Sequence, residues 1–418
     1  MSQIDRAWGA GPSARYDALA EPFRPIFDSI AASSVVREID HVLPKAEIAG
    51  LKQAGFTRLR VPAAEGGAGI TLAELFNLLI ELSEADPNVT NSLRAHFGFV
   101  EDVINSTDAE WRKLWVPRIV AGETAGSGFS ETGDAKQTVF STRLVRENGH
   151  YVLDGRKFYT TGSLIADYIN LGAVDENDQL VYATVPRAAE GVIVEDDWDG
   201  FGQQLTSSGT AVFSGVHVAA EYVSPSNARF QYAPSFFQLV HLATLAGIGR
   251  AAARDVAKLV AERKRSFSHG NAALPAHDAQ VLQIVGRVRG AAYAAGAIVL
   301  KTAEALDRVF EARQASDLEA TEAAVHIAEL EVSQAVTVVS NLVIDATSLL
   351  FDALGASSTR RGLGLDRHWR NARTITTHNP RFYRDRVVGD FAVNGTPPPG
   401  QYRVGIAEGA LDQPGKSS

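Results

Sequence analysis

From the N-terminus to about residue 120, the apolar positions follow a helical period. Leu75, Phe76 and Leu79 recur at three- and four-residue spacing, which places them on one face of a helix. Thr71 and Glu74 stand just before them with the spacing of a capping box, in which each side chain satisfies a first-turn amide. This pattern predicts an N-terminal helical domain over residues 1–121.

Two more helix starts can be placed in this region. Asp86-Pro87 combines an N-cap residue with a proline in the first turn, so we expect a helix that begins near Asp86 and carries His96. Thr107-Asp108-Ala109-Glu110 repeats the capping-box spacing and predicts the helix that follows it. The glycine-rich run 65–69 predicts a loop.

After Gly122 the helical period gives way to short runs of β-branched and aromatic residues. Asn148-Gly149 separates two such runs, and this dipeptide between apolar runs is a strong hairpin signal. The glycine-rich segment 126–133 predicts a polar loop at the entry to this part. Residues 122–230 therefore predict a small antiparallel β domain. Its expected strands lie at 144–145, 151–153, 168–174, 180–185, 210–213 and 216–218.

From Phe236 to about Leu354 the chain is again helical in pattern and rich in alanine. Breaks near 269–277 and 315–317 divide it into three long stretches, which predict a helical bundle that packs on itself in an oligomer. Beyond Gly355 the mixture of Gly, Arg, His and Pro predicts an irregular arm, extended at 397–399. The expected fold is α+β: helical domain, β domain, and a bundle with its arm over residues 231–418.

Composition narrows the possible functions. Forty Lys and Arg residues against 49 Asp and Glu residues give a net charge of −9, which disfavours binding to nucleic acid or to an anionic membrane. The chain has no cysteine, so disulfides, iron–sulfur clusters, thiolate zinc sites and cysteine nucleophiles are excluded. With no signal-peptide pattern and no uninterrupted apolar run of roughly 18 residues, we expect a soluble cytoplasmic protein.

One glycine motif has the spacing of a dinucleotide-binding fingerprint. Gly247-Ile248-Gly249-Arg250-Ala251-Ala252 fits GxGxxA, but the fingerprint requires a preceding strand and residues 236–245 are helical in pattern. We expect these small residues to allow close helix packing instead. No phosphate-binding loop, HExxH or GxSxG motif occurs, and no His, Asp and Glu cluster has metal-ligand spacing, so no metal is predicted.

Two polar segments of the β region carry candidate chemistry. The segment 126–133 could offer amides and hydroxyls to a flat heteroaromatic ring. The segment 154–162 ends with Tyr159, Thr160 and Thr161, which suit stacking and hydrogen bonding. Each segment taken alone is also compatible with ordinary β structure.

Taken together and in order, these segments resemble the acyl-CoA dehydrogenase superfamily over nearly the whole chain. The resemblance implies an α domain, a β domain and a C-terminal four-helix bundle, usually in a tetramer, with flavin bound between them. It rests on Phe56, Val61-Pro62, 66–69, Trp115-Val116-Pro117, Gly122-Glu123, Phe129-Ser130-Glu131-Thr132, Asp154-Gly155-Arg156-Lys157 and Val216-His217-Val218.

Other strings resemble one branch, the flavin-dependent monooxygenases typified by dibenzothiophene monooxygenase and its sulfone-metabolism relatives. These strings lie at 196–202, 204–210, 364–374 and 377–380. Many dehydrogenases of the superfamily carry their base in a Tyr-Glu-Gly-Thr string soon after an Arg-Asp-x-Arg element. Here Arg370-Asn371-Ala372-Arg373 is followed by Thr376-Thr377-His378-Asn379, with no carboxylate until Asp385. A histidine suits proton donation to an oxygenated flavin better than abstraction from carbon.

The resemblance implies a two-component monooxygenase. A separate NAD(P)H:flavin reductase would supply reduced FMN, or FADH2, and O2 would add at the flavin C4a carbon to give a hydroperoxide that oxygenates a small, organosulfur substrate. His96 and His378 would stabilise and protonate this species. Thr161 would donate to the flavin edge near N5, and Arg265 would hold the flavin phosphate. The remaining flavin-site candidates are Phe129, Ser130, Thr132, Tyr159 and Ser208.

Alternatives stay open at this point. An acyl-CoA dehydrogenase could carry its base on another element, and a catalytically inactive flavin-fold scaffold could bind partners only. His96 could be a core histidine, and Arg265 a surface residue of the bundle. The loop Ser130-Glu131-Thr132 resembles the dehydrogenase loop more than the monooxygenase one, and Thr161 stands where the monooxygenase often has serine.

Overall fold

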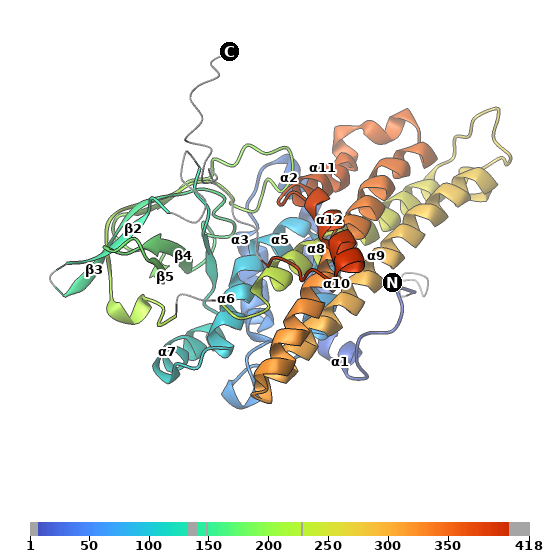
Figure 1. Cartoon of the computed structure of the whole chain (residues 1–418). Coiled ribbons are helices and arrows are strands. Elements are labelled where there is room, and N and C mark those ends of the chain that lie inside the picture. The colour runs from blue at the N-terminus through green and yellow to red at the C-terminus, as the bar shows by residue number, and fades with distance from the viewer. Residues whose placement is uncertain (1–6, 133–139, 148, 227–228, 401–418) are drawn as a thin grey trace, which may run out of the picture.

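The computed structural model describes residues 7–132, 140–147, 149–226 and 229–400. The strands lie at one side of the molecule and the long C-terminal helices at the other, with N-terminal helices between them (Figure 1). The fold class expected from the sequence is confirmed. The N-terminal helices are α1 (Tyr16–Ala20), α2 (Arg24–Ile39), α3 (Lys45–Gln53), α4 (Leu72–Ala85), α5 (Pro87–Ser92), α6 (Arg94–Ile104) and α7 (Ala109–Val120).

The helix starts follow the sequence signals, with two differences. The capping box of α4 is present, with Glu74 N–H donating to Thr71 Oγ1 at 3.1 Å and Thr71 N–H donating to Glu74 Oε2 at 2.9 Å. Asp86 caps α5, but α5 ends at Ser92 and His96 lies on the separate helix α6. The N-cap of α7 is Asp108 rather than the residue before it, because the Asp108 carboxylate accepts the amide of Trp111 at 2.8 Å.

The middle of the chain forms one seven-stranded sheet of order β1-β4-β2-β3-β7-β6, with β5 paired to β4. Four pairings are antiparallel: β2 with β3, β3 with β7, β6 with β7, and β4 with β5. The strands are β1 (Ala125–Gly128), β2 (Arg143–Glu147), β3 (His150–Lys157), β4 (Tyr168–Val174), β5 (Leu180–Pro186), β6 (Val192–Val194) and β7 (Ala211–Val218).

The predicted hairpin is present as β2 and β3, with Leu144 opposite Leu153, although Asn148 itself lies outside the described residues. The two last predicted strands are a single strand, β7. The segment expected to be a loop begins as strand β1, which runs parallel to β4. The glycines of this segment favour the prediction of a loop, but close packing of the strand requires them. A Cβ on Gly126 would lie 2.4 Å from the Cα of Ser163.

The C-terminal part contains the three predicted long helices, α8 (Ala233–Glu262), α9 (Ala279–Gln314) and α10 (Leu318–Leu349). The GxGxxA motif lies inside α8, where a Cβ on Gly247 would lie 2.4 Å from the Cβ of Ser83 in α4. The interpretation as a helix-packing motif is therefore confirmed.

The expectation of an irregular tail was wrong over much of its length, since α11 (Asp366–Thr376) and α12 (Phe382–Asn394) are helical. The buried face of α11 is polar, which hides it from an apolar periodicity. Arg367 and His368 both contact Asp255 of α8, at 2.8 and 2.9 Å. A helix docked largely through an ion pair and hydrogen bonds, with only Ala372 and Ile375 in the apolar core, gives a weak hydrophobic stripe in the sequence.

Two helical stretches, α8 and 318–353, are long and apolar enough to cross a membrane by length and composition alone. The most apolar window of α8 is 89% buried inside the fold, which is typical of a core helix, whereas that of 318–353 is 44% buried.

Candidate active site

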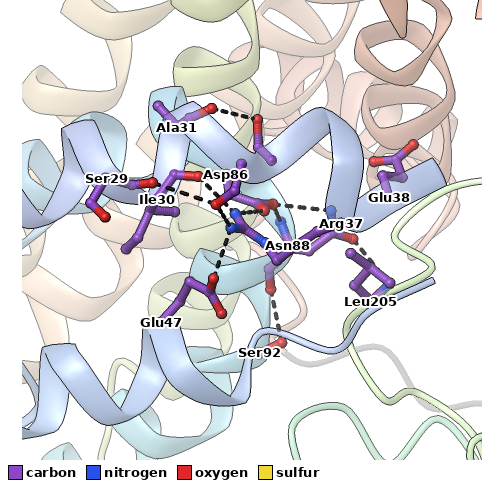
Figure 2. A network of polar contacts seen from close by, with 12 residues as sticks. Ser29, Ile30, Ala31, Arg37, Glu38, Glu47, Asp86, Asn88, Ser92 and Leu205 are labelled. Carbon is purple, nitrogen blue, oxygen red and sulfur yellow. Dashed lines mark hydrogen bonds and ion pairs between the residues drawn. The ribbon is translucent and has the colours of Figure 1, made fainter. Parts of the chain in front are cut away.

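A buried polar junction joins the helices to the segment that carries Ser208. Arg37 of α2 is 5% exposed and donates to Asp86 Oδ2 at 2.7 Å, to Glu47 Oε1 at 2.8 Å and to the carbonyl of Ile30 (Figure 2). Asp86 also accepts the backbone amide of Asn88 at 2.9 Å. The two terminal nitrogens of this buried cation are thus paired with carboxylates and a carbonyl, as a buried charge requires, while its Nε has no partner within the described residues.

The segment 203–208 is docked on this junction. Asn88 Oδ1 accepts the amide of Leu205 at 3.3 Å, as Figure 2 shows, and Asn91 donates to the side chain of Gln203 at 3.1 Å. From the other side, Asn371 of α11 accepts the amide of Gln203 at 2.5 Å. Helices from both ends of the chain therefore fix the position of this segment.

A chain of hydroxyl groups leads outward from the segment to Thr161. Thr206 Oγ1 donates to the carbonyl of Gln203 at 2.7 Å and lies 2.7 Å from Ser208 Oγ, which in turn lies 2.8 Å from Thr161 Oγ1. Thr206 is fully buried, Ser208 is 7% exposed and Thr161 is half-buried. The chain therefore ends at a hydroxyl that a ligand can reach.

The direction of these bonds follows from the fact that a hydroxyl has one hydrogen. The one hydroxyl hydrogen of Thr206 is donated to the Gln203 carbonyl. Ser208 must therefore donate to Thr206, and Thr161 must then donate to Ser208. Thr161 consequently presents lone pairs outward. It is arranged to accept a hydrogen bond, and not to donate one as the sequence-based hypothesis held. The N5–H of a reduced flavin is a matching donor, so these residues fit the reduced cofactor.

Backbone strain gathers around the same hydroxyls. Tyr159, Gln203 and Ser207 have φ angles of 57°, 54° and 48°, in the left-handed region that non-glycine residues avoid. Such conformations persist where the surroundings force them, and they cluster at functional sites. Tyr159 is 48% exposed, although its ring packs edge-on against Trp198 with centroids 5.9 Å apart.

The other flavin-site candidates lie at the end of β1. Phe129 is half-buried and packs edge-on against Tyr182, with ring centroids 5.6 Å apart. Ser130 and Thr132 are exposed, and the carbonyl of Ser130 accepts the amide of Phe158 at 3.0 Å. Because β1 also bonds to Thr161 through Ser127 N–H at 3.1 Å, Phe129 and the hydroxyl chain belong to one edge of the sheet.

Glu131 within this loop has a structural role. Its carboxylate accepts from Lys157 Nζ at 2.6 Å and from the amide and hydroxyl of Ser141, both at 2.7 Å. Although burial acts in the opposite direction, these hydrogen bonds and the Lys157 charge lower the pKa of Glu131 to about 2. Glu131 therefore fastens the loop to β3 as a permanent anion.

His96 is a buried residue whose two ring nitrogens are both satisfied. It is 1% exposed, its Nε2 donates to the carbonyl of Thr57 at 2.8 Å, and its Nδ1 accepts the amide of Ala125 at 3.4 Å. Burial lowers the pKa of His96 to about 4, with Lys52 adding to the effect. This arrangement matches the core-histidine alternative, and the structure does not bring His96 and His378 together.

His378 is instead paired with His241 of α8, with ring centroids 4.4 Å apart. His241 is 4% exposed, and its ring nitrogens have no hydrogen-bond partner within the described residues. Burial lowers its pKa well below the usual value, with Arg94 and His378 contributing. Neighbouring groups that crowd His378, together with the Arg94 charge, lower its pKa below the usual value, although the side chain itself is exposed to solvent at the surface. Both imidazoles are neutral at pH 7.

A stack of guanidinium groups and aromatic rings connects this pair to the sheet edge. Arg94 lies over the ring of Phe237, with Cζ 4.8 Å from the ring centroid, and Arg229 lies at 4.7 Å from the same centroid. Arg229 also lies over Phe129 at 4.8 Å. Gly98 makes room for Phe237, since a Cβ there would lie 2.2 Å from the ring. Helix-side and sheet-side residues thus form one continuous region.

Arg265 lies outside this region. It is exposed on the connection between α8 and α9, at the end of the bundle away from the strands (Figure 1). Within a single chain it is not brought together with Thr161 or Ser208.

The helical period of α6 could have shown from the sequence that His96 lies on the core face and Arg94 on the opposite face. His96, Val100 and Val103 share one face, which is the core face, and are all buried. Arg94, Gly98 and Asp102 follow the other face at four-residue spacing. His241 was detectable as a polar residue inside the apolar run 236–245.

Comparisons with known proteins define the class. The sequence profile of the acyl-CoA dehydrogenase N-terminal domain matches residues 18–123, and that of the C-terminal domain matches residues 239–380, together more than half of the chain. The chain belongs to the acyl-CoA dehydrogenase family, as the sequence resemblance predicted.

Relatives that match over most of both chains include several monooxygenases, which confirms the predicted branch, while acyl-CoA dehydrogenases match over shorter stretches. It is 26% identical to the probable FMNH2-dependent monooxygenase SfnC of Pseudomonas putida, over 89% of this chain and 93% of that protein. It is 25% identical to dibenzothiophene monooxygenase of Rhodococcus erythropolis, over 93% of this chain and 94% of that one. The FMN-bound structure of TdsC from Paenibacillus sp. A11-2 superimposes with a TM-score of 0.81 and 25% identity, covering 92% of this chain and 99% of TdsC.

Proposed function

We propose that the protein is a two-component flavin-dependent monooxygenase that uses reduced FMN and O2 to oxygenate a small organosulfur substrate. When bound, reduced flavin supplies two electrons and two protons, so that one oxygen atom enters the substrate and the other leaves as water. A separate NAD(P)H:flavin reductase would deliver the reduced flavin. The FMN-bound TdsC structure and the naming of SfnC support the choice of cofactor.

One observation carries this proposal over the dehydrogenase alternative. Removal of a proton from carbon needs a positioned base. The side chains that shift the pKa of His378 are Arg94 and Asn379, and no carboxylate of the described residues is among them. Two neutral imidazoles occupy this place. Neutral imidazole can donate one hydrogen bond and accept another, which suits holding a polar oxygen species in place.

The remaining residues have distinct tasks. Thr161 and Ser208 would hold the N5 edge of the flavin, and Phe129 with Tyr159 would border the ring. His378, backed by His241, would donate a hydrogen bond at the reacting oxygen. Phe237 and the stacked guanidinium groups would form one wall of this space, since their faces are packed against one another.

The test uses isotopic oxygen. Purified protein is mixed with reduced FMN, 18O2 and a panel of an aryl sulfide, a dialkyl sulfone and an alkanesulfinate, and the products are weighed by mass spectrometry. We expect one 18O atom in the product of at least one substrate, and none when NAD(P)H replaces reduced FMN. Reduction of a dye by an acyl-CoA without any need for oxygen would establish the dehydrogenase instead. Failure to bind flavin in either oxidation state would establish the inactive scaffold.

We also propose a homotetramer in which Arg265 reaches the flavin of a neighbouring copy. The supporting observation is that large apolar side chains of the bundle helices are exposed: Tyr293 of α9 is 50% exposed, and Ile327 and Val338 of α10 are 46% and 49% exposed. A particle mass of four chains by light scattering is the expected result.

A further inference from the structure

The environment of Arg94 shows an uncompensated positive charge. Arg94 is half-buried on α6, its Nε donates to the carbonyl of Phe237 at 3.2 Å, and its two terminal nitrogens have no hydrogen-bond partner within the described residues. The charged group that acts on it is Arg229, another cation. Burial and Arg229 lower the pKa of Arg94 to about 9, so it still carries its charge at pH 7.

Arg229 shows what a compensated guanidinium looks like in the same stack. It forms an ion pair with Asp102 of α6, to which its Nε donates at 3.0 Å. The stack thus holds two cations and one anion, and the anion is already engaged. A half-buried charge without a counter-ion within the described residues keeps terminal nitrogens that a ligand can reach and pair with.

His241 adds a second unsatisfied group to the same place. It is 4% exposed, has no hydrogen-bond partner in the described chain and interacts electrostatically with Arg94. Its ring nitrogens are not among the sealed, unbonded polar atoms of the described chain, so a ligand can reach them and complete their hydrogen bonding. A small hollow beside His241, with space for about one water molecule, is lined by Gln238, Thr376 and Asn379 and gives access to the imidazole.

We propose that Arg94 and His241 recognise an acidic group on the substrate, which is therefore a small organic anion: an organosulfur compound bearing a sulfinate or a carboxylate. The two terminal nitrogens of Arg94 match the two oxygens of such a group. His241 donates to it through one ring nitrogen. The apolar part of the substrate lies against Phe237. This inference rests on the proposed function, whose substrate class it narrows.

The test measures binding without turnover. Titration calorimetry under anaerobic conditions, with and without reduced FMN, compares 3-(methylthio)propanoate with its neutral methyl ester, and includes ethanesulfinate as a second anion. We expect Arg94→Gln to weaken binding of both anions about 30-fold, the loss of a charge-assisted pair of hydrogen bonds, and to change binding of the ester less than about three-fold. Arg94→Lys should fall between wild type and Arg94→Gln.

Arg308→Gln is the matched control. This substitution removes the same charge at a different place, because Arg308 pairs with Glu331 on the bundle surface. Should Arg94→Gln not fold, as judged by circular dichroism, Arg94→Lys decides alone, with about a five-fold loss for the anions and none for the ester. Equal losses for acid and ester, or no anion binding by wild type, would overturn the proposal. Arg94-dependent anion binding without oxygenation would leave the site standing while the monooxygenase assignment falls.

Discussion

The sheet side and the helix side of the candidate site differ in chemistry. The sheet side is made of hydroxyls, glycines and strained backbone: Thr161, Ser208 and Tyr159 stand on segments whose positions are locked by backbone hydrogen bonds. The helix side is made of long cationic and aromatic side chains, with Arg94, Phe237 and His378 projecting from α6, α8 and the end of α11.

This difference indicates a division of labour. Hydroxyls fixed to backbone recognise a cofactor whose shape does not change, whereas side chains on helices can be replaced one at a time to suit another substrate. Under the proposed function, the sheet side would select the flavin and its oxidation state, and the helix side would select the substrate. Variants that affect one side only are the means of testing this division.

The largest expected effect comes from the helix side. His378→Ala should lower the rate of substrate oxygenation about 100-fold, the typical cost of losing one positioned hydrogen-bond donor. The dissociation constant of reduced FMN should change less than about three-fold, because Thr161 and Ser208 are untouched. Both quantities are measured by anaerobic titration and by product formation. His269→Ala, on an exposed loop, is the control. A large loss of flavin affinity in His378→Ala would erase the division between the two sides.

His96 is buried in the core between Thr57 and Ala125, so we expect its substitution to change the stability of the fold. The neutral form is favoured in the folded protein, where the pKa is about 4, against 6.5 when unfolded. The unfolded chain therefore binds more protons below pH 6.5, and stability falls as the pH drops from 6.5 toward 4, by about 1.4 kcal/mol per pH unit from this residue. His96→Gln should remove that part of the slope in urea unfolding at pH 6 and pH 5.

Activity separates a core role of His96 from a catalytic one. The amide of Gln can still donate to the Thr57 carbonyl, so we expect His96→Gln to retain at least about a third of the oxygenation rate at pH 7. His269→Gln, at an exposed position, should leave the slope as in wild type. If His96→Gln left the pH dependence of the unfolding free energy unchanged and abolished oxygenation, His96 would have a catalytic role.

The smallest expected effect concerns the direction of the hydroxyl chain on the sheet side. Thr206→Val removes the hydroxyl that accepts the hydrogen bond of Ser208. Ser208 can then donate to Thr161, and Thr161 becomes free to donate to oxidised flavin. We expect the ratio of oxidised to reduced FMN affinity to rise about five-fold, roughly 1 kcal/mol, the worth of one hydrogen bond. Thr160→Val is the control, because that buried hydroxyl donates to the Gly209 carbonyl outside the chain. The same shift in both variants would refute the argument from bond direction.

Local signals predicted most of the elements, because caps, hairpin turns and apolar periods act over a few residues. Thr71, Asp86 and the hairpin of β2 and β3 are examples. Strand β1 and helix α11 were not predicted, because contacts with residues far away in the sequence stabilise them. Strand β1 needs its pairing with β4, and α11 needs the ion pairs that Asp255 makes with it.

The site could be predicted in part for the same reason. Motifs placed Thr161 and Ser208 on the sheet side, where the hydroxyl chain joins them. They could not give the direction of a hydrogen bond, which depends on a buried carbonyl at Gln203. Nor could they tell that His241, far along the chain, would be the imidazole beside His378.

The docking of segment 203–208 on Asn88 has a consequence for the order of assembly. Arg37, Asp86 and Asn88 all precede the first strand in the chain, so the surface that receives this segment is synthesised before either wall of the site exists. Domains tend to fold from the N-terminus as they emerge. The early helices would therefore fold first, and the sheet side and the helix side of the candidate site would then be positioned against them.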